Sequence, residues 1–186
     1  GSDAGELLVD LGCGRGEWLE LLGEQGFRAR GIDSNVGFLS QCEEAGLDVV
    51  ESDVLEYLAS LPDASVAVVS GFHIIEHLEF EVMVRLIDQA YRVLRDDGLA
   101  LFETPNPGNL IVGACNFYAD PTHVRQVFPP LLEFVMQSRG FRSVELRYLN
   151  PHPPEQELSQ HEAPVLAGQL NDLLSCARDF AVVAHK

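Results

Sequence analysis

The sequence is poor in basic residues. Its 186 residues contain 12 lysines and arginines against 29 aspartates and glutamates, so the formal net charge is −17. The basic side chains are scattered singly, without the cluster that would follow a phosphate backbone. This distribution argues against nucleic acid as a partner, and we interpret the acidity as a contribution to solubility.

Long apolar runs and paired cysteines are lacking as well. No run approaches the roughly 20 residues of a membrane span, and no signal-peptide pattern is present. The four cysteines show no C-x-x-C spacing, which favours reduced cysteines over a disulfide framework or a zinc site. We therefore expect a cytoplasmic protein with no membrane segment in this stretch. Residues 1–2 are interpreted as the remnant of a cleaved tag, and residues 3–186 as a single domain.

Short apolar runs alternate with segments of helical spacing along most of the chain. Strands are predicted at 7–11, 27–33, 47–51, 66–70, 99–103, 141–149 and 180–184. Helices are predicted at 17–25, 36–45, 55–61, 80–94 and 129–140, with 96–98 ending the fourth. The last two strands are expected to come nearly together. This order predicts an α/β, Rossmann-like, doubly wound fold with a mostly parallel seven-stranded sheet and an antiparallel last strand.

Two stretches, 105–128 and 150–164, lack clear periodicity. Loops of that length inside a compact domain are uncommon and are usually lids or binding loops. We therefore expect 105–128 to be an inserted substrate loop.

The stretch DLGCGRGEW, residues 10–18, places three glycines at alternate positions directly after the first predicted strand. Glycine lets the backbone turn tightly and lets a ligand touch the main chain. In open α/β sheets, ligands bind outside the carboxyl ends of the strands. Asp33 ends the second predicted strand about 20 residues further on, the usual offset of a carboxylate that binds ribose hydroxyls. Together these features indicate an adenosine-bearing ligand.

The glycine spacing distinguishes between two such ligands. The loop is G-x-G-x-G, not the G-x-G-x-x-G of dinucleotide-binding proteins, and Asp10 precedes the first glycine. A carboxylate there would repel a pyrophosphate but suits a cationic amino or sulfonium group, which disfavours a nicotinamide oxidoreductase. VDLGCGRG resembles the first motif of class I S-adenosylmethionine-dependent methyltransferases, D/E-x-G-x-G-x-G. The resemblance implies S-adenosyl-L-methionine as the methyl donor.

The resemblance also implies a set of donor-binding residues. The loop would pass the methionine and ribose parts of the donor, and Asp33 would hold the ribose. Asp53 would accept the exocyclic amine of adenine, although its position also suits a helix N-cap. The implied donor site comprises Asp10, Gly12, Gly14, Gly16, Asp33, Ser34, Asp53, Val54, Ser70 and Phe72.

The stretch FHIIEHLEF contains His73, Glu76 and His77 in an H-x-x-E-H pattern that also occurs in zinc proteases. Those enzymes need the pair on one continuous helix, whereas here it follows a predicted strand. Small-RNA 2′-O-methyltransferases hold a divalent ion with E-x-x-E-H and a later histidine, which would be His123. The imidazole of His73 in place of the first glutamate weakens a magnesium site. We therefore predict no metal. A further interpretation is that Glu76 and His77 only support the loop under the donor.

The segment from Glu103 to Phe134 resembles a subfamily of bacterial methyltransferases fused to, or encoded among, glycosyltransferases of O-antigen and other surface-polysaccharide pathways. The resemblance spans about residues 7–147. It implies O-methylation of a saccharide or sugar-linked phosphate, with a glycosyltransferase as a partner.

We predict His123 and His77 as catalytic residues, because imidazole has the intrinsic pKa of a general base. The predicted acceptor-binding residues are His73, Asn116, Tyr118, Asp120 and Arg125. Three alternatives remain open: a capped turn at 120–123 with a structural His123, a metal-assisted methyltransferase acting on another small-molecule or RNA hydroxyl, and a catalytically silent donor-binding module.

Overall fold

The computed structural model describes residues 6–153, 157–158 and 163–186, so the interpretation of residues 1–2 lies outside the described part. Seven strands form one sheet in the order β3-β2-β1-β4-β5-β7-β6. β7 runs antiparallel to both of its neighbours, whereas the other pairs are parallel. The predicted Rossmann-like fold is confirmed. The strands are β1 (Leu8–Leu11), β2 (Ala29–Asp33), β3 (Val49–Glu51), β4 (Val66–Phe72), β5 (Leu94–Pro105), β6 (Arg142–Leu149) and β7 (Asp179–His185).

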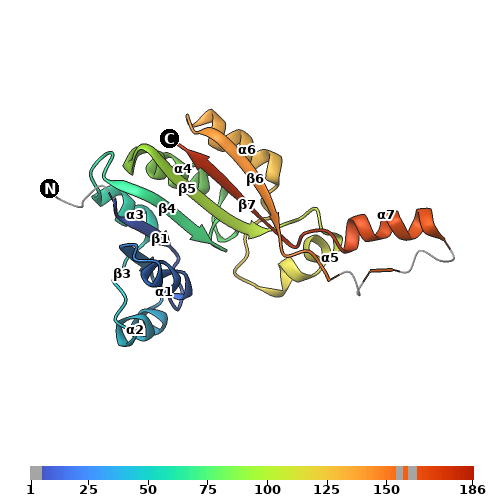
Figure 1. Cartoon of the computed structure of the whole chain (residues 1–186), viewed down its shortest axis with the longest axis horizontal. Coiled ribbons are helices and arrows are strands. Elements are labelled where there is room, and N and C mark those ends of the chain that lie inside the picture. The colour runs from blue at the N-terminus through green and yellow to red at the C-terminus, as the bar shows by residue number, and fades with distance from the viewer. Residues whose placement is uncertain (1–5, 154–156, 159–162) are drawn as a thin grey trace.

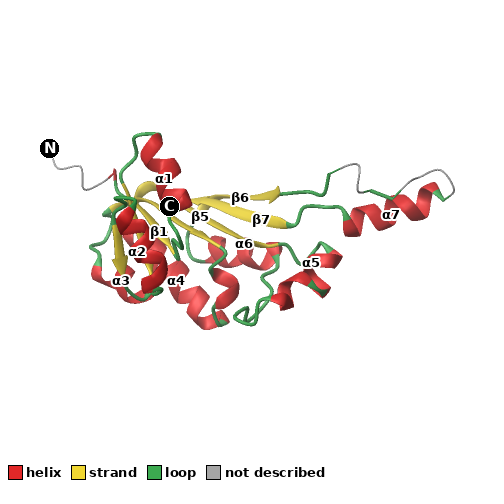
Figure 2. Ribbon diagram, turned by 90° about the horizontal axis from the view of Figure 1, so that it is seen from below, coloured by secondary structure: helices red, strands yellow, loops and turns green. Residues whose placement is uncertain are grey.

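Helices cover both faces of the sheet. α1 lies on the side opposite α4 and α6 (Figure 2). The larger core cluster joins the sheet to residues of α3, α4 and α6, and a smaller one contains Leu19 of α1 and Leu39 of α2. The helices of these two layers are α1 (Glu17–Glu24), α2 (Val36–Glu44), α3 (Val54–Ser60), α4 (Phe80–Val93) and α6 (Pro129–Ser138). None of the described helices is long and apolar enough to cross a bilayer.

The burial of each element follows its sequence pattern. All four residues of β1 are buried, as a continuous apolar run predicts for a strand covered on both faces. In α4 the buried side chains recur every three or four residues and form one apolar stripe. These are Met83, Leu86, Ile87, Ala90 and Val93. The opposite face of the helix is left to polar residues.

The predicted end of the fourth helix, Leu94, is within one residue of the observed end, but the predicted start of the fifth strand, Leu99, was wrong. α4 ends at Val93 and β5 begins at Leu94, so Asp96, Asp97 and Gly98 lie within the strand. Leu94 pairs with Val66, but the next pair joins Leu99 to Val68, so β5 carries extra residues at this point. The turn-forming residues therefore produce an irregularity in the strand rather than a loop before it.

The two late strands are not adjacent in the chain, contrary to our expectation. A helix, α7 (Pro164–Leu174), separates them and extends away from the sheet (Figure 1). It buries only Ala167 and Asn171 along its length. Its leucines, at positions 166, 170, 173 and 174, have a helical spacing that the sequence-based prediction overlooked. The segment 105–128 contains α5 (Leu110–Ala114) and the 3-10 helix η3 (Asn116–Ala119), both too short for a periodic pattern.

Gly31 in β2 is a point where the packing tolerates no side chain. A Cβ there would lie 2.6 Å from both Cys13 Sγ and Leu19 Cδ1. We expect Gly31→Ala to lower the free energy of unfolding by about 1–3 kcal/mol, because an extra methyl group forces the packed side chains apart. Urea denaturation measures this as a lower midpoint with an unchanged slope.

The matched control is Gly23→Ala. Gly23 is exposed in α1, and a Cβ there would meet nothing within 4 Å. Alanine should stabilise this position by up to about 1 kcal/mol through its higher helix propensity. A Gly31→Ala midpoint equal to or above that of wild type would contradict the packing argument.

Candidate functional site

The glycine loop connects β1 to α1 at the place where the strand order reverses. β1 lies between β2 and β4, which is where open α/β sheets form their ligand crevice. Gly16 caps α1 with φ of 87°, and a Cβ there would collide with the Leu47 side chain. At Gly14, with φ of 55°, a Cβ would meet nothing within 4 Å. The loop therefore requires glycine at Gly16 and leaves the main chain open at Gly14.

Asp33 holds this loop from the neighbouring strand. The Gly14 N–H donates to Asp33 Oδ2 at 2.9 Å, and the Asn35 N–H donates to Oδ1 at 2.8 Å. The carboxylate at the end of β2 thus lies against the glycine loop. This is the position that the offset between Gly14 and Asp33 predicts for a ribose-binding acid.

A cavity of about 440 Å³ opens beside the loop. Asp10, 3% exposed, accepts a hydrogen bond from Ser70 Oγ at 2.7 Å, and Trp18 Nε1 donates to the same hydroxyl at 3.2 Å. The Trp18 ring packs against Phe72 with 5.2 Å between centroids. The cavity is lined by Asp10, Gly12, Cys13, Gly14, Glu17, Trp18, Leu21 and Phe72. Its mixture of carboxylates, open main chain and aromatic rings suits a cationic, nucleoside-bearing ligand.

Burial raises the pKa of Asp10 to about 6. The hydrogen bond from Ser70 opposes this shift, and the charge of Asp33 adds to it. A buried carboxylate with a raised pKa gains most from a cationic partner. Trp18 was not among the residues predicted from the sequence, although it follows the glycine motif by only two positions.

Six of the ten predicted donor residues are not among those that line this cavity, namely Gly16, Asp33, Ser34, Asp53, Val54 and Ser70. Asp33 and Ser70 still contact it, since they hydrogen-bond to the lining residues Gly14 and Asp10. Asp53 caps α3, since its Oδ1 accepts from the N–H groups of Leu55 and Glu56. Val54 packs against the main core, and Ser34 is exposed. Asp53 nevertheless lies near the end of β2, because the preceding Ser52 N–H donates to Asp33 O at 3.1 Å. Its N-cap role is therefore observed, and its adenine contact stays a prediction.

A second group of polar side chains lies beyond β4. Glu76, His77 and His123 each offer one ligand atom, and these atoms lie within 4.8 Å of one another. Glu76 is fully buried, and it accepts hydrogen bonds from Thr104 Oγ1 at 3.0 Å and from His73 Nδ1 at 3.1 Å. The main chain joins the two segments, because the Val124 N–H donates to Glu76 O at 2.9 Å.

Hydrogen bonds to carbonyl groups orient both catalytic candidates. His123 Nδ1 lies 2.6 Å from Phe117 O, and His77 Nδ1 lies 3.1 Å from Thr122 O. A carbonyl oxygen only accepts, so each Nδ1 carries a hydrogen, and in the neutral form of each ring Nε2 is the nitrogen with the lone pair. The two rings meet edge to face at 4.7 Å. The turn is capped as well, since Asp120 Oδ1 accepts from Thr122 N–H and Oγ1.

A cavity of about 300 Å³ adjoins this group and is lined by Pro105, Val112, Asn116, Phe117, His123, Arg178 and Asp179. Of the five predicted acceptor-binding residues only Asn116 lines it, together with the catalytic candidate His123. Tyr118 is 70% exposed beside Phe117, and the Arg125 guanidinium stacks over the Phe80 ring at 4.9 Å. Sequence reasoning missed Arg178 and Asp179, because the unrecognised helix α7 precedes them and no motif surrounds them.

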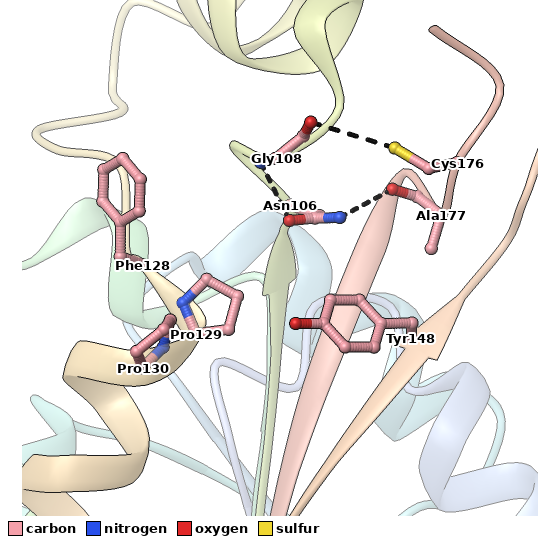
Figure 3. A pocket seen from close by; sticks show the side chains of 8 residues that line it. All are labelled: Asn106, Gly108, Phe128, Pro129, Pro130, Tyr148, Cys176 and Ala177. Carbon is pink, nitrogen blue, oxygen red and sulfur yellow. Dashed lines mark hydrogen bonds between the residues drawn. The ribbon is translucent and has the colours of Figure 1, made fainter. Parts of the chain in front are cut away.

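A further cavity of about 440 Å³ lies at the end of β5, between α6 and β6 (Figure 3). Asn106 forms its floor, where Nδ2 donates to Ala177 O and Oδ1 accepts from the Gly108 N–H. The Tyr148 ring points across it toward Pro129 (Figure 3). The sequence analysis did not anticipate this cavity, since its walls come from segments up to 71 residues apart.

Comparisons with known proteins agree with this geometry. The family described as "Methyltransferase domain" matches residues 2–146, and the chain belongs to it. A "SAM dependent methyltransferase" from Archaeoglobus fulgidus is 34% identical with a TM-score of 0.90, covering 97% of this chain and 86% of that one. The site and family together define a class I S-adenosylmethionine-dependent methyltransferase, with S-adenosyl-L-methionine as the methyl donor.

Two curated relatives carry similar names. A "probable S-adenosylmethionine-dependent methyltransferase" of Mycolicibacterium smegmatis is 29% identical over 74% of this chain and 52% of its own length. One of Mycobacterium tuberculosis is 26% identical over 88% of this chain and 59% of its own. The chain thus spans between half and three fifths of these relatives. A phosphoethanolamine N-methyltransferase from Haemonchus contortus, crystallised with S-adenosyl-L-methionine, shares the fold at 17% identity and a TM-score of 0.72, covering 100% of this chain and 50% of that one.

The raised pKa of Asp10 predicts pH-dependent affinity for the donor. We expect the ionised carboxylate to attract the cationic amino group of S-adenosylhomocysteine, and its ionised fraction falls as the pH drops through about 6. Between pH 7.5 and pH 5 we expect the dissociation constant to rise about tenfold in calorimetric titration. Asp10→Asn should bind weakly and equally at both pH values. Equal affinity of the wild type at the two pH values would contradict this role for Asp10.

Proposed function

We propose that this chain transfers the methyl group of S-adenosyl-L-methionine to an oxygen atom of a saccharide or of a sugar-linked phosphate. The observation that carries the proposal is the Glu76, His77 and His123 group. Glu76 and His77 follow closely in the chain on a residue of the donor cavity, our name for the cavity of about 440 Å³ beside the glycine loop. Phe72 lines that cavity, and the chain runs from it directly into the segment that bears His77. Methyl transfer to a hydroxyl oxygen requires a proton acceptor close to the oxygen, and imidazole suits that role at neutral pH.

The residues of this chain would align the acceptor and remove its proton. S-adenosyl-L-methionine supplies an electrophilic methyl carbon, whose bonding electron pair returns to sulfur as the acceptor oxygen attacks. In the neutral imidazole of His123 the lone pair lies on Nε2, because Nδ1 donates to Phe117 O. It accepts the hydroxyl proton, while the walls of the adjoining cavity hold the oxygen in line with the breaking bond.

The lining of the 300 Å³ cavity supports a polar acceptor. Asn116 and Asp179 offer groups for sugar hydroxyls, and the Arg178 guanidinium offers donors for a phosphate. Tyr118 and Asp120 are exposed nearby and would contact a larger saccharide at its outer end. We further propose that the substrate belongs to surface-polysaccharide biosynthesis and that a glycosyltransferase supplies it, as the resemblance of residues 103–134 implies.

The test is methyl transfer from labelled donor to two panels of acceptors. One panel contains free, phosphorylated and lipid-linked saccharides, and the other contains primary and secondary amines, including phosphoethanolamine. We expect label in the first panel, with an O-methyl group identified by NMR. Label only on amines would overturn the oxygen assignment. Binding of S-adenosylhomocysteine without transfer to any acceptor would favour a silent donor-binding module.

A further inference from the structure

We propose that Glu76, His77 and His123 form a binding site for one divalent transition-metal ion. This reverses our sequence-based prediction of no metal, and it arises from how the structure groups these residues. Their ligand atoms lie within 4.8 Å of one another, and Glu76 Oε1 is 4.0 Å from His123 Nε2. Ligands of one bound ion are about 3–3.5 Å apart, since metal–ligand distances are about 2.0–2.2 Å. Side-chain shifts of less than about 1 Å would therefore close the site.

The surroundings hold each ligand in the orientation that metal binding requires. Metal-binding histidines usually donate their other ring N–H to a carbonyl or carboxylate, which fixes the tautomer. His123 does so to Phe117 O, and His77 does so to Thr122 O. Glu76 is steadied by Thr104, whose hydroxyl donates to Oε2. The two ligand segments are tied together by the bond from Val124 N–H to Glu76 O.

The charges in this region favour a cation. Glu76 is a fully buried carboxylate whose Oε1 accepts a hydrogen bond from His73 Nδ1, and a bound ion would take the place of that imidazole as the partner of the buried charge. Asp120 Oδ2, 3.9 Å from His123 Nε2, adds negative charge at the edge of the site. Two imidazole nitrogens and one oxygen suit Zn²⁺, Co²⁺ or Mn²⁺ better than Mg²⁺, which prefers an all-oxygen shell.

Such an ion would deepen the proposed function, and this part of the inference rests on it. Three protein ligands leave coordination positions open, and His123 also lines the adjoining 300 Å³ cavity. A substrate hydroxyl bound there becomes more acidic and loses its proton to solvent water. Its oxygen then attacks the donor methyl carbon, the carbon–sulfur bond breaks and its electron pair stays on sulfur. In this metal-dependent version of the reaction both imidazoles bind the ion, so neither accepts the proton of the hydroxyl.

Cobalt titration of tag-free, chelator-treated protein tests the site without a substrate. We expect one Co²⁺ per chain, visible as d–d absorption bands, and displacement by Zn²⁺. Glu76→Gln, His77→Asn and His123→Asn should each weaken Co²⁺ binding at least about tenfold. His185→Asn removes an exposed histidine at the end of β7 and should leave it unchanged. Titration with S-adenosylhomocysteine identifies which variants are folded.

Each outcome bears on the proposal. Absence of saturable Co²⁺ binding, or binding that persists in folded His77→Asn and His123→Asn proteins, overturns the site. Loss of O-methyl transfer on chelation, with recovery on addition of Zn²⁺, Co²⁺ or Mn²⁺, supports the role in catalysis. Full transfer in the presence of chelator overturns that role and leaves the proposed function with His123 as the direct base. Transfer only to amines contradicts the proposed function, while the Co²⁺ titration still decides the site.

Discussion

Replacement of Asp33 by alanine is expected to weaken the binding of S-adenosylhomocysteine by at least about 100-fold. One reason is the loss of hydrogen bonds from the ribose hydroxyls, because bonds to a charged group contribute about 1.5–3 kcal/mol each. The other is that Asp33 Oδ2 accepts the Gly14 N–H, so the variant also loses the contact that steadies the glycine loop. Both effects act on the donor site, and calorimetric titration measures their sum.

The control for this variant is Asp48→Ala. Asp48 is a partly exposed carboxylate that pairs with Arg30 at 2.9 Å and lies outside the donor cavity. Its removal should change donor affinity less than about twofold, since exposed ion pairs contribute little. If Asp33→Ala binds S-adenosylhomocysteine within threefold of wild type, the ribose of the donor lies elsewhere.

Replacement of His123 by asparagine is expected to lower kcat by about 100- to 1,000-fold while donor affinity stays within twofold of wild type. Loss of a general base costs about 100- to 10,000-fold, and loss of a metal ligand acts on the same step. Asparagine retains a polar group near Phe117 O, which now faces Nδ1 of the imidazole at 2.6 Å. Single-turnover rates with a saccharide acceptor measure the effect.

His185→Asn again provides the matched histidine control and should retain wild-type turnover. A His123→Asn enzyme that turns over within threefold of wild type would show that His123 is a structural residue of the capped turn at 120–123. Reduced affinity for S-adenosylhomocysteine in the same variant would point instead to a rearranged loop under the donor.

Most of the sheet and its covering helices could be predicted from the sequence. The buried run of β1 and the apolar stripe of α4 are local patterns whose periods match a strand and a helix. The errors have different causes. The helix α7 was overlooked although its leucines at positions 166, 170, 173 and 174 have helical spacing. Asp96–Gly98 enters β5 because pairing with β4 prevails over the turn preference of those residues.

The contact between the glycine loop and Asp33 could also be predicted from the sequence. Gly12, Gly14 and Gly16 belong to one short motif. Asp33 follows about 20 residues later, because one helix and one strand lie between the glycine loop and the end of β2. The structure brings Asp33 onto Gly14 as that spacing predicts. It also adds Trp18, whose Nε1 donates to Ser70 Oγ, 52 residues further along the chain.

By itself, the sequence determined most of the strands and helices and the glycine loop that we predict to bind the methyl donor, because both depend on residues close together in the chain. Only the tertiary structure decided which residues form the proposed acceptor side. It brings His77 to His123, Thr104 to Glu76, and Arg178 and Asp179 to the wall beside Asn116. These contacts arise from the packing of segments that are far apart in the chain, and no local period or motif records which of those segments will meet.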